Sequence, residues 1–181
     1  MMHRVFIPYG MVLALAAMPP AYAQLTDKGA TVAPGATIAH SDVVWMERAA
    51  RAGVAEIEAG KLAMAQGKRD AVRNFGKMMA EQHGQSNDDL IAIAARKRVL
   101  LSTKTDEAHI KWLARLSGLS GDAFDKEYLQ NAGLKDHTDA AKLFEDGVAN
   151  LKDPDLKEYA QKTVPVIKQH FEMVREIRPV P

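Results

Sequence analysis

The chain has 181 residues, contains no cysteine, and carries 24 basic and 23 acidic side chains. Its length and its hydrophobic content of 47% predict one globular domain, while the lack of cysteine excludes disulfides and thiolate metal ligands. Loss of Arg4 with the N-terminal segment would leave 23 charges of each sign. That balance argues against a nucleic-acid partner, because a protein that neutralises phosphates needs a basic surplus.

Residues 1–23 have the order of a secretory signal peptide. Arg4 precedes the apolar run VFIPYGMVLALAAM, and the small residues Ala21 and Ala23 stand before Gln24. We expect cleavage after Ala23 and export to the periplasm. The mature chain should lack a membrane span, since the apolar run is short and Pro8 interrupts it. Residues 24–40 carry Gly and Pro without periodicity, which predicts a flexible leader.

From residue 41 to about 178 the hydrophobic pattern is helical, with no alternating strand pattern. The predicted helices cover residues 41–66, 70–98, 105–117, 120–150 and 154–177. Ser41 and Ser120 are helix-start signals, and Asp153 followed by Pro154 is a stronger one. Pro165 lies inside the last helix and predicts a bend.

Four long helices and one short one predict an all-α domain, a four-helix bundle. Tight breaks join the first two and the last two long helices. A partly helical connection of about 22 residues lies between these two hairpins, long enough to return the chain along the bundle. This pattern predicts ferritin-like connectivity with a short crossover helix, and an up-down-up-down order stays open.

Three histidines occupy core positions of three different long helices. His83, His137 and His170 each lie within roughly one turn, about 5 Å, of the middle of their helix, so we expect them to lie close together. Glu56 falls in a stripe of small residues on the first long helix and is the favoured inward acid, with Glu58 as the alternative.

Two functions remain open for this set. The histidines form a buried hydrogen-bonded network in a non-catalytic envelope or stress-related protein, which we favour narrowly. Alternatively, the three imidazoles and Glu56 hold one transition-metal ion, Zn, Fe, Mn or Cu, for storage or redox chemistry. A weaker hypothesis is small-ligand binding where Pro165 opens the core.

A di-iron oxidase is disfavoured, and no catalytic residue is assigned. Such a site needs Glu-x-x-His on two helices, so that the acid and the imidazole share one face. The residues three positions before the histidines are Ala80, Leu134 and Ile167.

Several segments resemble a bacterial family of exported helical proteins, a domain of unknown function in the ferritin-like superfamily whose members are often labelled as outer-membrane proteins. They are AEIEAGKLA at 55–63, LSGLSGDAFDKEYL at 116–129, Asp136-His137, and VPVIKQHFEM at 164–173. The resemblance covers residues 43–177. It implies a ferritin-like bundle in the cell envelope, with a protein partner or peripheral outer-membrane association, and no defined activity. Gln82-His83 departs from the family's acid-then-histidine pattern.

Overall fold

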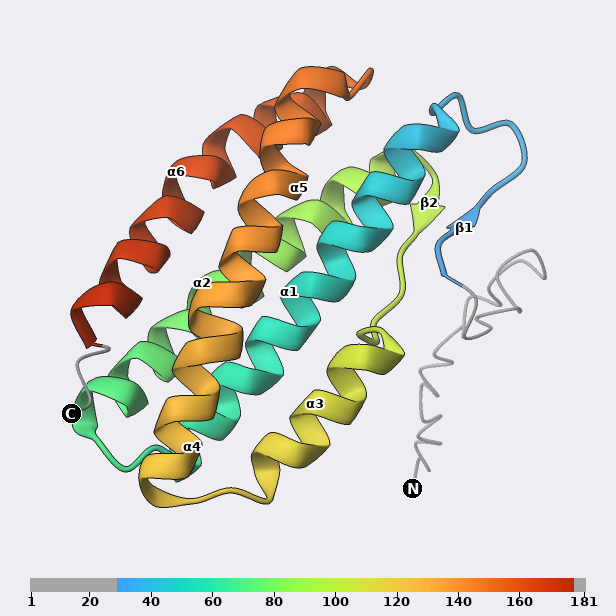
Figure 1. Cartoon of the computed structure of the whole chain (residues 1–181). Helices are drawn as coiled ribbons and strands as arrows, with labels where there is room; N and C mark the ends of the chain where they lie inside the picture. Colours follow the sequence, from blue (N-terminus) through green and yellow to red (C-terminus); the bar gives the residue numbers. More distant parts are fainter. Residues whose placement is uncertain (1–28, 178–181) are drawn as a thin grey trace, which may run out of the picture.

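Helices make up almost all of residues 29–177, the part of the chain that the computed structural model describes (Figure 1). The predicted signal peptide lies outside these residues. The elements are β1 (Thr31–Val32), α1 (His40–Gln66), α2 (Asp70–Arg96), β2 (Val99–Leu100), α3 (Glu107–Ser117), α4 (Gly121–Tyr128), the π-helical η2 (Leu129–Asp136), α5 (His137–Asn150) and α6 (Pro154–Ile177). The all-α prediction is confirmed, and the predicted helix 120–150 consists of α4, η2 and α5 in succession.

The long helices form two antiparallel pairs, which pack against each other (Figure 1). One pair is α1 with α2, and the other is α6 with the run from α4 through η2 to α5. Between the pairs, the chain leaves β2 and returns beside α1 through α3, so that α2 and α5 run in the same direction. Among the described helices, none is long and apolar enough to cross a membrane.

Two very short strands tie the segment before α1 to the end of α2. β1 and β2 are antiparallel, with Thr31 opposite Leu100 and Val32 opposite Val99. The sequence pattern does not predict this pairing, because two residues are too few to show a strand's alternation. β1 lies within residues 24–40, the segment expected to be a leader.

The helix-start signals differ in how well they match the structure. Asp153 caps α6 as predicted, since its Oδ1 accepts the backbone N–H groups of Asp155 and Leu156 at 3.0 and 3.3 Å. Ser41 is not a cap, because α1 begins at His40 and the Ser41 hydroxyl donates to Asp42 instead. α6 continues through Pro165 from end to end.

Close packing of α1 on α2 depends on two glycines that face each other. A Cβ atom at Gly60 would lie 2.6 Å from the Gly76 carbonyl oxygen, and one at Gly76 would lie 2.5 Å from the Ala63 Cβ. Both distances are too short for real atoms, so only glycine permits this approach. The stripe of small residues on the first long helix thus lets α2 approach closely.

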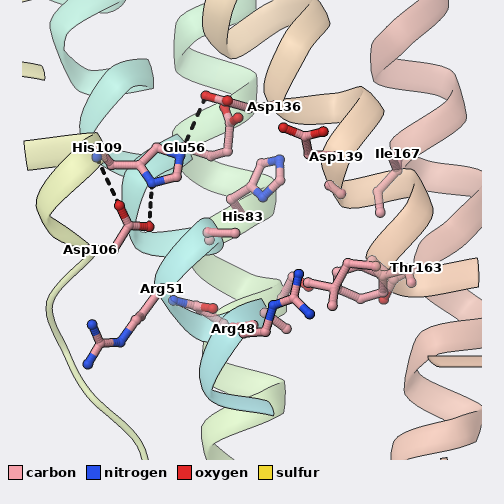
Figure 2. A pocket seen from close by; sticks show the side chains of 18 of the residues that line it. Arg48, Arg51, Glu56, His83, Asp106, His109, Asp136, Asp139, Thr163 and Ile167 are labelled. Atoms are coloured by element: carbon pink, nitrogen blue, oxygen red, sulfur yellow. Dashed lines mark hydrogen bonds and ion pairs between the residues drawn. The ribbon is translucent and has the colours of Figure 1, made fainter. Parts of the chain in front are cut away.

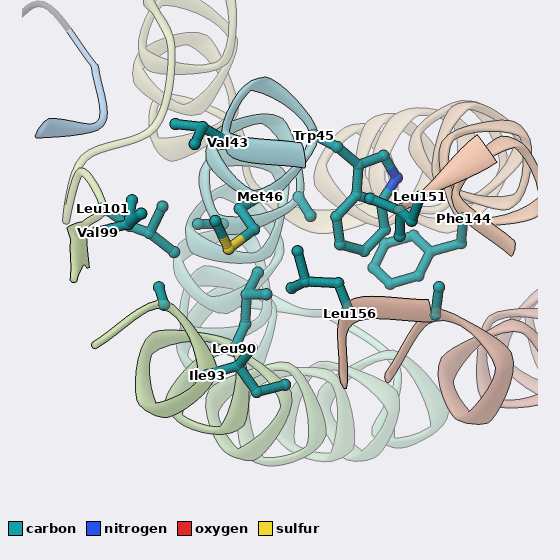
Figure 3. Close-up of a cluster of buried hydrophobic side chains, with 14 of the residues drawn as sticks. Val43, Trp45, Met46, Leu90, Ile93, Val99, Leu101, Phe144, Leu151 and Leu156 are labelled. Atoms are coloured by element: carbon teal, nitrogen blue, oxygen red, sulfur yellow. The ribbon is translucent and has the colours of Figure 1, made fainter. Parts of the chain in front are cut away.

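The core consists of two hydrophobic clusters, one toward each end of the long helices. We call them the Trp45 cluster, which includes Trp45, Met46, Leu90, Phe144 and Leu156 (Figure 3), and the Tyr128 cluster, which includes Phe75, Met79, Leu116, Phe124, Tyr128 and Val174. On every long helix a polar residue separates the two clusters in the sequence. These residues are Glu56, His83, His137 and His170.

Candidate metal centre

The three predicted histidines meet in the core. His83 comes from α2, His137 from the first position of α5, and His170 from α6. One ring nitrogen of each lies within 4.8 Å of the other two. The ring centroids are 5.4 to 5.8 Å apart. The predicted convergence at the middle of the helices is confirmed.

The hydrogen bonds of His137 and His170 define which ring nitrogens carry protons. The Nδ1–H of His137 donates to the Ala132 carbonyl at 2.7 Å, and the Nε2–H of His170 donates to the Gln82 side-chain oxygen at 2.6 Å. Both partners can only accept, and a neutral imidazole has a single N–H. The other nitrogens, His137 Nε2 and His170 Nδ1, therefore face each other as lone pairs at 3.3 Å.

Burial keeps these rings in the form that binds metals. His137 and His170 are each 2% exposed, and His83 is half-buried, with a buried Nε2 that has no hydrogen-bond partner in residues 29–177. Burial, reinforced by the neighbouring imidazoles, lowers the pKa of His83 well below its usual range and that of His170 to about 4. Burial also lowers the pKa of His137. All three rings are neutral at neutral pH.

The spacing of the facing nitrogens suits a shared ion. Two imidazole ligands with bonds of about 2.1 Å at a tetrahedral angle have nitrogens about 3.4 Å apart. The 3.3 Å between His137 Nε2 and His170 Nδ1 matches this value. One ring nitrogen of His83 lies within 4.8 Å of both.

Glu56 lies beside this cluster and not within it. It is 6% exposed, while the alternative acid, Glu58, is exposed and pairs with Lys61. The Glu56 Oε1 is 3.9 Å from His137 Nδ1, the ring nitrogen that does not face His170. Neither carboxyl oxygen has a hydrogen-bond partner among the described residues. Burial, and then the nearby Asp136 charge, raise the pKa of Glu56 well above its usual range.

The π-helical segment η2 contributes to the site just before His137. Its Ala132 carbonyl, five residues before His137, accepts the bond from that ring. π-Helical turns are frequent at functional sites, where they redirect the groups that follow. Tyr128, which precedes η2, has a buried hydroxyl without a partner in the described chain, and burial, together with the Glu56 charge, raises its pKa.

His109, to which the sequence analysis gave no role, connects the crossover helix to the site. Its Nδ1 lies 2.6 Å from Asp106 Oδ2 and its Nε2 lies 3.8 Å from Asp136 Oδ2 (Figure 2). The Asp136 and Asp106 carboxylates raise the pKa of His109 to about 8. His109 is thus mostly protonated at neutral pH, and it attaches α3 to the residue before His137.

Two cavities approach the cluster from different sides. One, of about 310 Å³, is lined by residues of α1, α2, α3, α5 and α6, and it reaches Glu56 and His83 (Figure 2). We call it the His83 cavity. The other, of about 360 Å³, lies between α5 and α6 and reaches His137.

These features define a class of protein: a helical domain of two antiparallel pairs with a buried three-histidine cluster. Residues 28–177 match Domain of unknown function (DUF4142), and the chain belongs to this family. Its structure is similar to the crystal structure of a DUF305 fragment from Deinococcus radiodurans, with a TM-score of 0.68 and 11% identity over 77% of this chain and 96% of that chain. At this identity the likeness concerns the fold alone. No curated protein matches the sequence.

Sequence reasoning predicted the three histidines and missed the groups that orient them. The Ala132 carbonyl leaves no signal, because every residue has one. Gln82 could have been noticed only as the residue that breaks the acid-then-histidine pattern. The expected membership in a family of unknown function agrees with the match over residues 28–177.

Proposed function

We propose that this protein binds one transition-metal ion through His83, His137 and His170. The observation that supports this most directly is the pair of facing, unprotonated nitrogens at 3.3 Å. Two lone pairs at that distance repel each other unless a cation or a proton lies between them. Both rings also donate their remaining N–H to an oxygen, which is the usual arrangement of metal-bound histidines.

The donor set favours some metals over others. Neutral imidazoles suit zinc, copper and iron, whereas manganese prefers oxygen ligands. Glu56 is the acid nearest to the cluster, and its carboxylate would offset part of the ion's charge in the core or act as a fourth ligand. The histidines lack the Glu-x-x-His pairing of di-iron sites, so we propose a mononuclear centre that stores the ion or uses it in redox chemistry.

We also propose that the protein is exported to the periplasm and is a ferritin-like four-helix bundle. The charge, apolar run and small residues of positions 1–23 support export with cleavage after Ala23. The crossover through α3 between two helical hairpins supports ferritin-like connectivity. An envelope protein partner and peripheral outer-membrane association belong to the same proposal, and they rest on the family resemblance.

The second candidate function is a metal-free histidine network in a non-catalytic envelope protein. It is favoured by the two hydrogen bonds that His137 and His170 already make within the chain. One additional proton between the facing nitrogens would complete such a network.

Metal analysis of the mature chain, residues 24–181, separates the two functions. The protein is purified without chelator or polyhistidine tag, and its metal content is compared with that of His83→Ala, His137→Ala, His170→Ala and, as a control, His40→Ala, which changes an exposed histidine. We expect one ion per chain in the wild type and the control, and an affinity at least about 100-fold weaker in the three cluster variants.

Circular dichroism of each variant checks that the helices remain. A wild-type protein that binds no zinc, copper or iron, even after reconstitution, would contradict the metal proposal and favour the network.

A further inference from the structure

The His83 cavity is large enough to hold a small molecule next to the metal centre. Its volume of about 310 Å³ corresponds to roughly ten waters at about 30 Å³ each. Small residues on facing helices, Ala52 and Gly53 on α1 and Ala140 on α5, leave this space open. The cavity therefore provides a route to the cluster that does not require the helices to separate.

The inner end of this cavity carries buried polar atoms that lack partners. Both carboxyl oxygens of Glu56 and the Nε2 of His83 are buried without a hydrogen bond in residues 29–177. Glu56 as a whole is only 6% exposed. Buried polar groups in proteins are nearly always paired, so unpaired groups at one end of a cavity indicate a site for a bound ligand.

The outer ring nitrogens of His137 and His170 are already occupied by hydrogen bonds. The outer nitrogen of His170 is bonded to Gln82, and the outer nitrogen of His137 to the Ala132 carbonyl. Three imidazoles also leave a four-coordinate ion one ligand short. A molecule in the His83 cavity would approach the ion from the side where the cluster is open.

One basic side chain at the cavity, Arg48, is placed to attract an anion. Four acids line the cavity: Asp106 pairs with His109, Asp136 and Asp139 share Lys135 at 3.7 and 2.9 Å, and Glu56 lies 3.9 Å from the His137 ring. Arg48 also lines it, and the structure shows no ion pair or hydrogen bond of the Arg48 side chain within residues 29–177 (Figure 2). The ion held by three neutral imidazoles adds further positive charge.

We propose that the His83 cavity binds a small anion as the exogenous ligand of the metal ion, with Arg48 attracting it. This inference rests on the proposed metal site. With such a ligand position the metal centre would be open on one side, as catalytic metal sites are, whereas structural metal sites are closed by protein ligands.

Azide binding to the Co²⁺-loaded protein tests this inference. Co²⁺ is added to the metal-free chain, its stoichiometry is measured, and the visible absorption bands of Co²⁺ are followed during an azide titration. We expect azide to change the bands of the wild type. Ala140→Phe fills the His83 cavity and should weaken azide binding at least about 10-fold, since the added ring occupies the ligand's place.

Ala141→Phe is the matched control. Ala141 is the next residue on the same helix, is also partly buried, and lines the cavity between α5 and α6 instead. The Ala141→Phe variant should bind azide like the wild type. A second pair does not alter the packing: Arg48→Gln should weaken azide binding several-fold, and Arg115→Gln, at an exposed arginine that does not line the cavity, should not.

Each result has one meaning. If Co²⁺ binds but azide leaves its bands unchanged, or if Ala140→Phe and Arg48→Gln bind azide like the wild type, the inference is wrong and the metal site stands. If the wild type binds no Co²⁺, zinc or copper, the proposed function fails and this inference fails with it. If Ala140→Phe no longer binds Co²⁺, the azide affinity of Arg48→Gln decides: an affinity equal to that of the wild type overturns the inference, and a weaker one supports it.

Discussion

At the scale of single residues, two oxygen atoms determine the chemistry of the histidine cluster. The Ala132 carbonyl and the Gln82 side chain each accept one N–H, which turns the other nitrogen of each ring toward the centre. Without these bonds either ring could turn its N–H inward, where it would block an ion. Orientation by such outer partners commonly accounts for about 10- to 100-fold in metal affinity.

Gln82 offers a direct test of this effect because it lies at the surface and contributes little to the core. We expect Gln82→Ala to weaken zinc binding about 10- to 100-fold, since His170 loses the partner that holds its tautomer. Gln82→Glu should bind at least as tightly as the wild type, because a carboxylate accepts the same bond and increases the basicity of the ring. Competition with a chromophoric chelator measures all three affinities.

Gln85→Ala is the control for the Gln82 variants. Gln85 lies on the same helix, and its side-chain amide donates to the exposed Asp89 at 3.1 Å, away from the histidines. If Gln82→Ala binds zinc as tightly as Gln85→Ala, the Gln82 bond does not orient His170 and the proposed tautomer is wrong.

The same residues show how far the sequence can predict the site. His83, His137 and His170 could be placed together because a helix midpoint lies at the same level whichever way the helix runs. The inward position of Glu56 followed from its place among small residues. The relation of Glu56 to the ring nitrogens did not, since a helical pattern gives the face of a residue and not its distance from a particular atom.

At the scale of elements, the turn between α1 and α2 and the turn between α5 and α6 are each stabilised by a buried aspartate from another part of the fold. Asp125 on α4 accepts the backbone N–H groups of Lys68 and Arg69 and the Arg69 side chain, at 2.8 to 3.1 Å. Asp42 on α1 accepts the N–H groups of Lys152 and Asp153. Each carboxylate satisfies donors that a tight turn between helices would otherwise leave unpaired.

Replacement of Asp125 should therefore destabilise the protein. Asp125→Ala leaves two backbone donors and the Arg69 Nε–H without their partner at a position that is 1% exposed. We expect a loss of about 2–4 kcal/mol in the free energy of unfolding, measured by urea denaturation. Asp122 lies on the same helix as Asp125 and forms an exposed ion pair with Lys68. The control Asp122→Ala, which removes this ion pair, should cost less than about 1 kcal/mol. Equal losses in the two variants would refute the stabilising role of Asp125.

Prediction of the elements succeeded where the signal is long and failed where it is short or non-local. Hydrophobic periodicity over more than twenty residues identified the long helices. The paired residues of β1 and β2 are too few to show alternation. The π-helical turns of η2 have a different period from an α-helix, so an α-helical pattern does not reveal them. Asp125 looked like an ordinary helical acid, because its partners are 56 and 57 positions away.

At the scale of the whole molecule, the histidine layer divides one core into two. The Trp45 and Tyr128 clusters each bury apolar side chains, while Glu56 and the three histidines between them contribute little hydrophobic stabilisation. A continuous apolar core would be more stable, since buried polar atoms without a hydrogen-bond partner, such as the Glu56 carboxyl oxygens and His83 Nε2 among the described residues, cost free energy. The two apolar clusters therefore provide the stability that the polar layer lacks.

This layer predicts a characteristic pH dependence for the metal-free protein. The pKa of His170 falls from 6.5 when unfolded to about 4 when folded, because the ring is buried and lies next to His137. Between these values the unfolded chain binds a proton that the folded chain does not. The His170 contribution to stability is therefore complete above about pH 6.5 and is lost as the pH falls toward 4, by roughly 3 kcal/mol at 1.36 kcal/mol per pKa unit.

His109 acts in the opposite direction on the alkaline side. Its pKa rises from 6.5 to about 8 in the folded state, so its contribution is present below about pH 6.5 and is lost as the pH rises through 8. Because the ring is partly solvated, about 1 kcal/mol is expected. The stability of the metal-free chain should be greatest near pH 6.5, as measured by urea denaturation in the presence of a chelator.

Two variants test which residue causes the loss of stability at low pH (the acid limb of the curve of stability against pH) and which causes the loss at high pH (the alkaline limb). His170→Gln keeps a polar side chain without a titrating group and should flatten the acid limb, leaving the alkaline limb unchanged. His109→Gln should do the reverse. Bound metal should steepen the acid limb, since protons then compete with the ion for the imidazoles. If stability falls as steeply at low pH in His170→Gln as in the wild type, the loss arises from His83, His137 or the carboxylates and not from His170.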